Sequence, residues 1–360
     1  MNEVIDVPAE KRHLDDFHQS LQNLSILVIE GNTSTENLLY KELAPDDTRG
    51  IVSIGIRLRR LGLRHIIVPS DSLNLQAFIA DADLVMIYAH GEYGEDGRLQ
   101  GWLDYIGKPY TGPGVFASAV CLDKLTFKRL LASAGLDTPK FSELFEDSAS
   151  ATANAVKIGF PLMAKLRTGG SSIGIHFLPT AEQFHDWLQN LPTVERGRYL
   201  LEKHIAGRFL TVGIVQMSRS DLYLPALEVR TPDGFYYDQR SKLGVDSAHC
   251  EPEFIVPAPI PLETQRRIND ICREAYRLTG CAGMARVDLM LDREGVPWLL
   301  EINTIPGLSR KSNLTCEFMH LGFSYEQLLL AVLRTASLRT GPSVAKRAGM
   351  PDQHSIACNG

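Results

Sequence analysis

Two apolar runs late in the chain decide the fold, Ala285-Arg-Val-Asp-Leu-Met-Leu291 and Trp298-Leu-Leu-Glu-Ile-Asn303. Each run has the length and composition of a strand, and only the short segment Asp292-Arg-Glu-Gly-Val-Pro297 separates them. Two such runs joined by a turn that contains Gly predict a β-hairpin. We therefore expect the two strands to lie side by side in one sheet.

Polar side chains interrupt both runs at alternate positions. Because side chains alternate between the faces of a strand, Arg286 and Asp288 share one face, as do Glu301 and Asn303. Pairing the strands gathers all four on one surface, between apolar flanks that imply a buried cluster. Such oxygen ligands suit Mg²⁺, which commonly shares its shell with nucleotide phosphates. We expect Asp288, Glu301 and Asn303 to bind metal; the alternative is a solvated hairpin face.

A strand followed by a glycine-rich turn forms the second candidate site. Phe160-Pro-Leu-Met-Ala-Lys165 predicts a buried strand, and Leu166-Arg-Thr-Gly-Gly-Ser-Ser-Ile-Gly174 follows it. Backbone N–H groups and the hydroxyls of Ser171 and Ser172 suit phosphate binding, with Lys165 as a positive charge. The turn is not a Walker A loop, because no Gly-Lys-Ser/Thr sequence occurs. The alternative for the turn alone is an ordinary hairpin.

A third glycine-rich loop is His90-Gly-Glu-Tyr-Gly-Glu-Asp-Gly97, directly after an apolar run that ends at Ala89. Its glycines allow a tight loop at the carboxyl end of a strand, where α/β proteins bind ligands. It does not match the GxGxxG dinucleotide fingerprint, so it gives little support to an oxidoreductase.

Composition limits the classes of protein that the chain can belong to. Its 360 residues are 44% hydrophobic and 22% charged, with a net charge of −6, which is typical of a globular protein with two or three domains. A nucleic-acid or membrane partner is not expected, because both favour a clustered excess of Lys and Arg. The first residues lack the pattern of a signal peptide, and six scattered Cys show no metal spacing. We expect a cytoplasmic protein.

The order of apolar runs predicts the domain organisation. Strands at residues 24–29, 65–68 and 83–88 alternate with a helix near 49–62, which favours an open, mostly parallel α/β sheet. The fold class is therefore α/β (α+β). The expected parts are a polar leader at 1–23, an N-terminal α/β domain at 24–120, a central domain at 121–212, a C-terminal domain at 213–337 and a disordered tail at 338–360.

Together these segments resemble the D-alanine–D-alanine ligase family, within the ATP-grasp superfamily. The resemblance covers about residues 24–337, and its landmarks occur in the family's order. They are Gly31-Asn-Thr-Ser-Thr-Glu36, the loop at 90–97, Gly101, Pro109-Tyr-Thr-Gly112, Leu122-Asp-Lys124, Met163-Ala-Lys165, Gly170-Ser-Ser-Ile-Gly174, Leu201-Glu-Lys203, Arg286-Val-Asp288 and Glu301-Ile-Asn-Thr-Ile-Pro-Gly307. The resemblance implies an ATP-grasp fold, in which the central and C-terminal domains enclose the nucleotide.

The resemblance also implies the residues that hold ATP. The phosphates would contact Lys124, Lys165 and Lys242, under a loop that contains Ser171 and Ser172. Adenine would lie at Glu202, Lys203 and Ile205. Two Mg²⁺ ions, with Mn²⁺ as an alternative, would be held by Asp288, Glu301 and Asn303, the last of which also lies beside the nucleotide.

Substrate roles follow from the same resemblance, and so does a homodimer formed through the N-terminal domain. Glu36 would fix the ammonium group of the first amino acid, with His90 beside it. Arg286 and the N–H of Gly307 would stabilise the tetrahedral oxyanion, with Ser171 among the catalytic residues. Ser312 would receive the carboxylate of the second amino acid, next to Asn313.

The chain departs from the family pattern at four positions. Phe209 stands where a Glu usually contacts the ribose, Leu166 replaces Pro, Leu243 replaces Tyr, and Asn313 replaces Leu. The resemblance implies an ATP-dependent ligase that forms a dipeptide through an acyl phosphate. The last two departures lie on the acceptor side and favour a second substrate other than D-alanine. The alternatives are a related ligase for other amino acids and a catalytically inactive relative that binds nucleotide.

Overall fold

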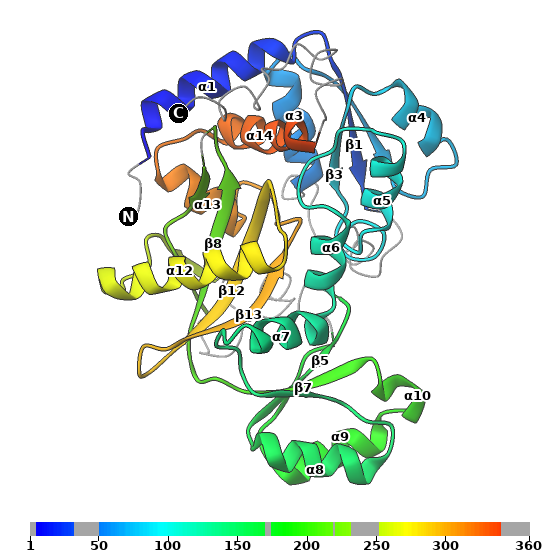
Figure 1. Ribbon diagram of the computed structural model, residues 1–360, viewed down its shortest axis with the longest axis vertical. Helices are drawn as coiled ribbons and strands as arrows, with labels where there is room; N and C mark the ends of the chain where they lie inside the picture. Colours follow the sequence, from blue (N-terminus) through cyan, green and yellow to red (C-terminus); the bar gives the residue numbers. More distant parts are fainter. Residues whose placement is uncertain (1–4, 32–49, 170–173, 219, 232–251, 340–360) are drawn as a thin grey trace, which may run out of the picture.

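The structure is a computed structural model that describes residues 5–31, 50–169, 174–218, 220–231 and 252–339. Three sheets follow one another along its length, as Figure 1 shows. The N-terminal sheet lies at one end, a six-stranded sheet forms the middle, and a four-stranded sheet with its helices lies at the other end.

The N-terminal sheet is parallel and confirms the predicted α/β class. It has the order β2-β1-β3, with β1 (Ser25–Glu30) between β2 (Arg64–Pro69) and β3 (Leu84–Tyr88). Strands β1 and β3 are almost wholly buried. Helices cover parallel sheets on both faces, which explains why these two strands read as continuous apolar runs. The accompanying helices are α3 (Gly50–Arg60), α4 (Leu75–Asp81) and α5 (Arg98–Tyr105).

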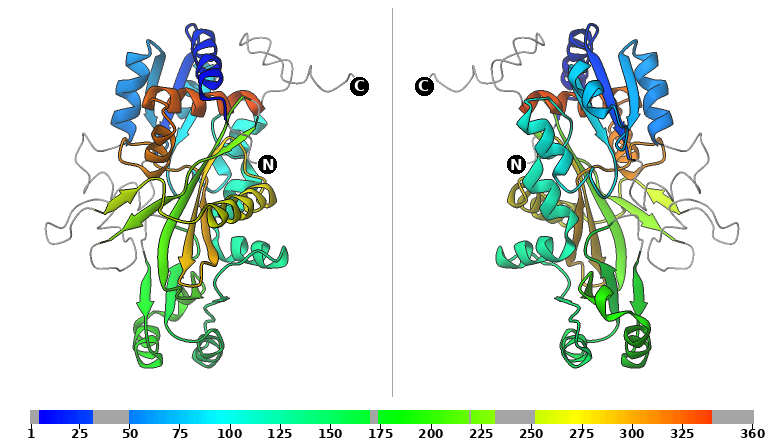
Figure 2. Two further views of the ribbon diagram at one scale, coloured as in Figure 1. Left: turned by 90° about the vertical axis from the view of Figure 1, so that its left-hand side faces the viewer. Right: turned by 90° about the vertical axis from the view of Figure 1, so that its right-hand side faces the viewer.

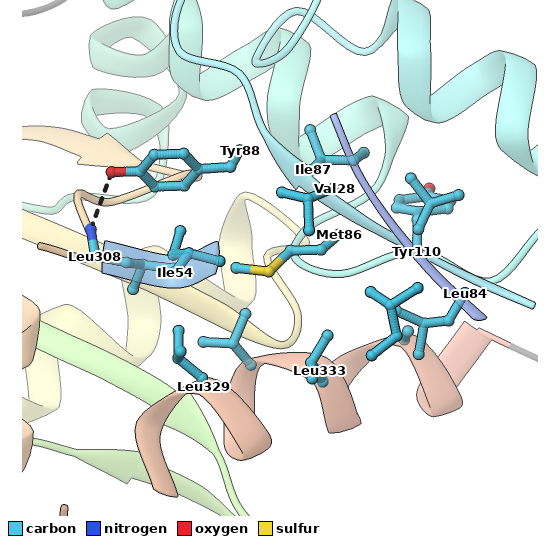
Figure 3. Close-up of a cluster of buried hydrophobic side chains, with 14 of the residues drawn as sticks. Val28, Ile54, Leu84, Met86, Ile87, Tyr88, Tyr110, Leu308, Leu329 and Leu333 are labelled. Carbon is cyan, nitrogen blue, oxygen red and sulfur yellow. Dashed lines mark hydrogen bonds between the residues drawn. The ribbon is translucent and has the colours of Figure 1, made fainter. Parts of the chain in front are cut away.

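The two ends of the described chain meet over this sheet. Helix α14 (Tyr325–Arg334) packs against the N-terminal sheet, and Leu329 and Leu333 face Val28 and Met86 in the cluster of Figure 3. Helix α1 (Val7–Ser20) packs on α14 and buries the apolar side chains of Leu14 and Phe17, and Leu21, which follows the helix, is buried as well. The segment expected to be a polar leader thus belongs to the first hydrophobic core.

The central sheet is antiparallel, with the order β4-β7-β5-β6. Its strands are β4 (Phe141–Glu143), β5 (Leu162–Leu166), β6 (His176–Leu178) and β7 (Tyr199–Lys203). Helices α8 (Ser148–Ile158), α9 (Ala181–Asn190) and α10 (Thr193–Arg196) accompany it, and α8 and α9 contribute to its core.

The middle sheet contains the predicted hairpin, which is confirmed. Its order is β11-β10-β8-β12-β13, and β9 pairs with β8. The strands are β8 (Gly207–Gln216), β9 (Asp221–Tyr223), β10 (Leu227–Arg230), β11 (Glu253–Ile255), β12 (Met284–Asp292) and β13 (Pro297–Asn303). Asp288 lies opposite Glu301, and Arg286 opposite Asn303. A bulge between Asp288 and Leu289 shifts the register, so Leu299 and Ile302, three positions apart, both face the core.

Helices cover the two faces of the middle sheet unequally. One face packs against α6 (Val115–Leu122), α7 (Lys124–Ser133) and α12 (Leu262–Leu278), which lie on the same side of the sheet in Figure 2. On the other face α13 (Asn313–His320) contacts β8, and this face carries Arg286 and Asp288.

The expected domain boundary at 212/213 falls inside β8, and the one at 120/121 falls inside α6. No helix in the described ranges is long and apolar enough to span a membrane.

Candidate active site

Arg286 and Asp288 form a tight pair on the open face of β12. Arg286 donates from Nε to Oδ1 at 2.7 Å and from Nη2 to Oδ2 at 2.8 Å, and both side chains are largely buried. Burial alone would lower the pKa of Arg286, but the charges of Asp288, Glu301 and Glu317 raise it above its ordinary value. Arg286 therefore keeps a fixed positive charge although its side chain is largely buried.

Lys124 lies at the opposite side of the same cluster. Its Nζ is 3.3 Å from Oε2 of Glu301 and also donates to the carbonyl oxygen of Gly169. Lys124 is the first residue of α7, whose N-cap Asp123 accepts hydrogen bonds from Thr126 N and Arg167 Nη2. The capped helix end and the segment after β5 thus hold the lysine in place.

The oxygen donors predicted for metal lie together. Asp288 and Glu301 are opposite each other across the β12–β13 pair, and Asn303 Oδ1 accepts from Ile305 N at 3.1 Å. Among the described residues no group of three or more His, Cys, Asp and Glu could hold a metal ion; this site has two carboxylates and one amide. That all-oxygen set, neutralised by Arg286 and Lys124, fits Mg²⁺ shared with phosphates.

A buried ion triad joins the central sheet to α7. Glu202 and Lys165 lie on the sheet, and Lys128 lies on α7. Glu202 accepts from Lys165 at 2.6 Å, and its other oxygen is 2.5 Å from Nζ of Lys128. Burial would raise the pKa of Glu202, but the two lysines lower it below its ordinary value. Burial, together with the charge of Lys165, lowers the pKa of Lys128 despite Glu202. Sequence reasoning missed Lys128, although its place four residues after Lys124 in an amphipathic helix was a signal.

The hinge between the central and middle sheets carries the other expected nucleotide residues. Lys203 closes β7 and donates from Nζ to the carbonyl oxygens of Gly159 and Phe160 at 3.1 and 2.6 Å. Ile205 is half-buried in the link to β8. Phe209, the departure noted from the family pattern, lies on β8 opposite Met290 on β12, so the two form an apolar pair.

The loop after β3 reaches the C-terminal segment. The ring of His90 packs edge-on against Tyr88 at 5.0 Å between centroids. Glu95 is buried and accepts from Gly91 N at 2.6 Å and from Ile305 N at 3.3 Å. Gly94 is required here, because a Cβ would lie 1.7 Å from the carbonyl oxygen of Ala89.

The segment from Gly307 to α13 contacts the strand that leads to His90, since Leu308 N donates to the hydroxyl of Tyr88 at 3.4 Å. Ser312 occupies the N-cap position of α13, and its Oγ accepts from Ser309 N at 3.0 Å rather than from the helix. A Cβ at Gly307 would lie 2.8 Å from that Oγ, so the backbone passes close to the serine. Asn313 is buried, and its Nδ2 is 3.4 Å from Oγ1 of Thr211.

Four expected site residues lie outside the described residues, namely Glu36, Ser171, Ser172 and Lys242. The others converge along one face of the middle sheet and the adjoining edge of the central sheet. Two charged residues of this region were not predicted, Lys128 and Glu317, and both are buried and have polar partners.

Comparison with known proteins gives consistent matches. A family model described as D-ala D-ala ligase C-terminus matches residues 130–334. The D-alanine–D-alanine ligase of Janthinobacterium sp. is 38% identical over 282 residues, covering 77% of this chain and 86% of that protein. The ligase of Herminiimonas arsenicoxydans is 36% identical over 283 residues, covering 78% and 83%.

Solved structures agree with the sequence matches. The D-alanine–D-alanine ligase from Bacillus anthracis superposes with a TM-score of 0.72 at 26% identity, covering 88% of this chain and 98% of that one. The structure of the same ligase complexed with ATP gives 0.70 at 25% identity, with the same coverage.

Proposed function

Since the chain belongs to the D-alanine–D-alanine ligase family of ATP-dependent, ADP-forming ligases, we propose that it joins two amino acids through an acyl phosphate and that its acceptor is not D-alanine. The pair of Lys124 and Glu301 carries the ATP-dependent part of this proposal, and Asn313 carries the part about the acceptor. Their 3.3 Å contact sets a phosphate-binding cation against a carboxylate of the expected metal site.

The first half-reaction transfers the γ-phosphoryl group of ATP to the carboxylate of the donor amino acid. Lys124, Lys165 and Lys242 neutralise phosphate charge, and Ser171 and Ser172 bind the phosphates. When bound, two Mg²⁺ ions at Asp288, Glu301 and Asn303 supply further charge neutralisation. The adenine lies at the hinge, beside Glu202, Lys203 and Ile205.

The second half-reaction needs an anion site for the tetrahedral intermediate. The acceptor amine attacks the acyl carbon, and negative charge develops on the former carbonyl oxygen. Arg286, held by Asp288 at 2.7 and 2.8 Å, and the N–H of Gly307 stabilise that oxyanion. Phosphate leaves as the C–N bond completes.

The two amino acids occupy opposite sides of this centre. Glu36 and His90 hold the donor at its ammonium group, and Ser312 receives the carboxylate of the acceptor. Asn313 adds a polar group beside the acceptor where the family usually has Leu, and that difference favours an acceptor other than D-alanine. A homodimer formed through the N-terminal domain and a cytoplasmic location complete the proposal.

The test is Mg²⁺-ATP-dependent phosphate release across single and paired amino acids of both configurations, with mass spectrometry of the products. Release with a particular pair and a dipeptide of matching mass would support the proposal and identify the substrates. Brisk formation of D-alanyl-D-alanine from D-alanine alone would refute the assigned acceptor. Nucleotide binding with no product from any pair would instead favour the inactive relative, for which Phe209 is the motivating observation.

A further inference from the structure

Glu317 is a fully buried acidic residue that has no part in the proposed chemistry. It lies on α13 with 0% of its surface exposed, facing β8. Thr211 Oγ1 donates to its Oε1 at 2.6 Å, and the N–H of Gly213 donates to Oε2. Both oxygens of the carboxyl group therefore accept hydrogen bonds from residues of the same strand, β8.

The contacts of Glu317 fall directly beside the proposed catalytic pair. In the β8–β12 register, Thr211 lies opposite Asp288 and Gly213 lies opposite Arg286. Gly213 is required for this approach, because a Cβ would lie 2.4 Å from Leu314 Cδ1 and 2.6 Å from Glu317 Oε2. Hydrogen bonds from Glu317 thus attach α13 to Thr211 and Gly213, the two positions of β8 that lie opposite Asp288 and Arg286.

The same contact extends to the start of α13. Thr211 Oγ1, which donates to Glu317, also lies 3.4 Å from Nδ2 of Asn313. Asn313 is the first residue of α13, directly after Ser312. A buried polar chain therefore runs from Glu317 through Thr211 to the turn that faces the acceptor. Buried polar groups that are mutually hydrogen-bonded restrict a structure to one arrangement.

We propose that Glu317 is a positioning residue that holds the first turn of α13 against β8, opposite Arg286, and so sets the affinity for the acceptor amino acid. This inference rests on the proposed ligase function, because the acceptor is defined by that reaction. Most groups of the donor half lie on other elements, β3, α7 and β13, and the one on β12, Asp288, is held by two hydrogen bonds from Arg286. The donor reaction should therefore not depend on Glu317.

Two variants separate positioning from general stability. Glu317→Met keeps the volume and removes both hydrogen bonds, whereas Glu317→Gln keeps an acceptor for Gly213 and a partner for Thr211. We expect E317M to raise the KM for the acceptor about tenfold. The KM for ATP and the rate of acyl-phosphate formation with the donor alone should stay unchanged, and E317Q should restore the acceptor KM. Glu274→Gln, on the outer face of α12 and paired with Arg277, is the matched control.

A second position keeps the inference testable if E317M does not fold. Thr211→Val removes the hydroxyl that joins Glu317 to Asn313, and Thr211→Ser retains it, so only T211V should raise the acceptor KM. An unchanged acceptor KM in folded E317M or T211V would overturn the positioning role, as would an equal loss in both half-reactions. If the wild-type enzyme forms no product with any amino acid, the proposed function fails first, and this inference fails with it.

Discussion

Lys124, in the first turn of α7, places its Nζ 3.3 Å from the carboxylate of Glu301 on β13. The two residues come from distant parts of the sequence and from helix and strand, yet they meet at the edge where the central and middle sheets adjoin. An ammonium group and a carboxylate in contact are a neutral pair that polyphosphate and Mg²⁺ can separate, each charge then binding its opposite. Without ligands, the site thus already holds one charge that can bind an anion, the polyphosphate, and one that can bind a cation, Mg²⁺.

Glu301→Gln should abolish Mg²⁺-dependent ADP release, with a loss of more than about 100-fold, because even residues outside the ligand shell commonly cost 10- to 100-fold. The amide keeps the shape and removes the negative charge that faces Lys124. A coupled assay for ADP across a range of Mg²⁺ concentrations measures the loss. Glu294→Gln, in the exposed turn of the same hairpin, should retain activity. If E301Q released ADP at the wild-type rate, Glu301 would not be a ligand of the metal.

Lys128→Met should destabilise the protein by about 3 kcal/mol, because removing one partner from a buried ion pair leaves an uncompensated charge. Lys128 has a side-chain exposure of 1% and lies 2.5 Å from Glu202, whose own exposure is 2%. Lys165 still neutralises Glu202 in this variant, which limits the loss. Urea unfolding gives the value. Lys157→Met, on the exposed face of α8, should change stability by less than about 0.5 kcal/mol, and an equal effect of both substitutions would contradict the triad.

Gly213→Ala should cost about 1–3 kcal/mol, the usual range for overpacking a core. The added Cβ would meet Leu314 Cδ1 and Glu317 Oε2 at 2.4 and 2.6 Å, so these two fully buried side chains would have to shift. Gly197→Ala is the matched control, since a Cβ there meets nothing within 4 Å and the backbone φ is −60°. Thermal unfolding of the two variants compares them directly. Equal melting temperatures of the two variants would show that the neighbours of Gly213 accommodate the extra methyl group without loss of stability.

Glu317 should give the protein a distinctive dependence of stability on pH. Burial raises its pKa to about 8, whereas a Glu in an unfolded chain titrates near about 4.3. The stabilising contribution is therefore fully present below about pH 4 and is lost as pH rises through about 8. Relative to Glu317→Gln, which cannot titrate, the wild-type free energy of unfolding should fall by up to about 1.4 kcal/mol per pH unit in this window. Parallel profiles of the two proteins would disprove the raised pKa.

The hairpin of β12 and β13 could be predicted because its signals are local. Strand alternation fixes which side chains share a face, and the register places Asp288 opposite Glu301 as expected. The bulge that follows Asp288 could not be predicted, because an extra residue in one strand leaves no mark in an apolar run. The parallel sheet was predictable for the same reason as the hairpin, since buried strands are continuous apolar segments.

Lys128, Glu317 and α1 were harder to interpret for a common reason. A charged residue inside a helix reads as solvated unless its partner is known, and the partners Glu202 and Thr211 are remote in sequence. Helix α1 is polar overall, and its few apolar side chains gain meaning only beside α14. Tertiary contact, rather than local pattern, decides such positions.

The packing of α14 on the N-terminal sheet has a consequence for biosynthesis. Leu329 and Leu333 belong to nearly the last described helix, yet they cover Val28 and Met86, which leave the ribosome early. Until α14 has been translated, the nascent sheet presents this apolar surface to its surroundings. A chain that stops before residue 325 therefore never completes its first core, and it exposes apolar surface of the kind that leads to aggregation.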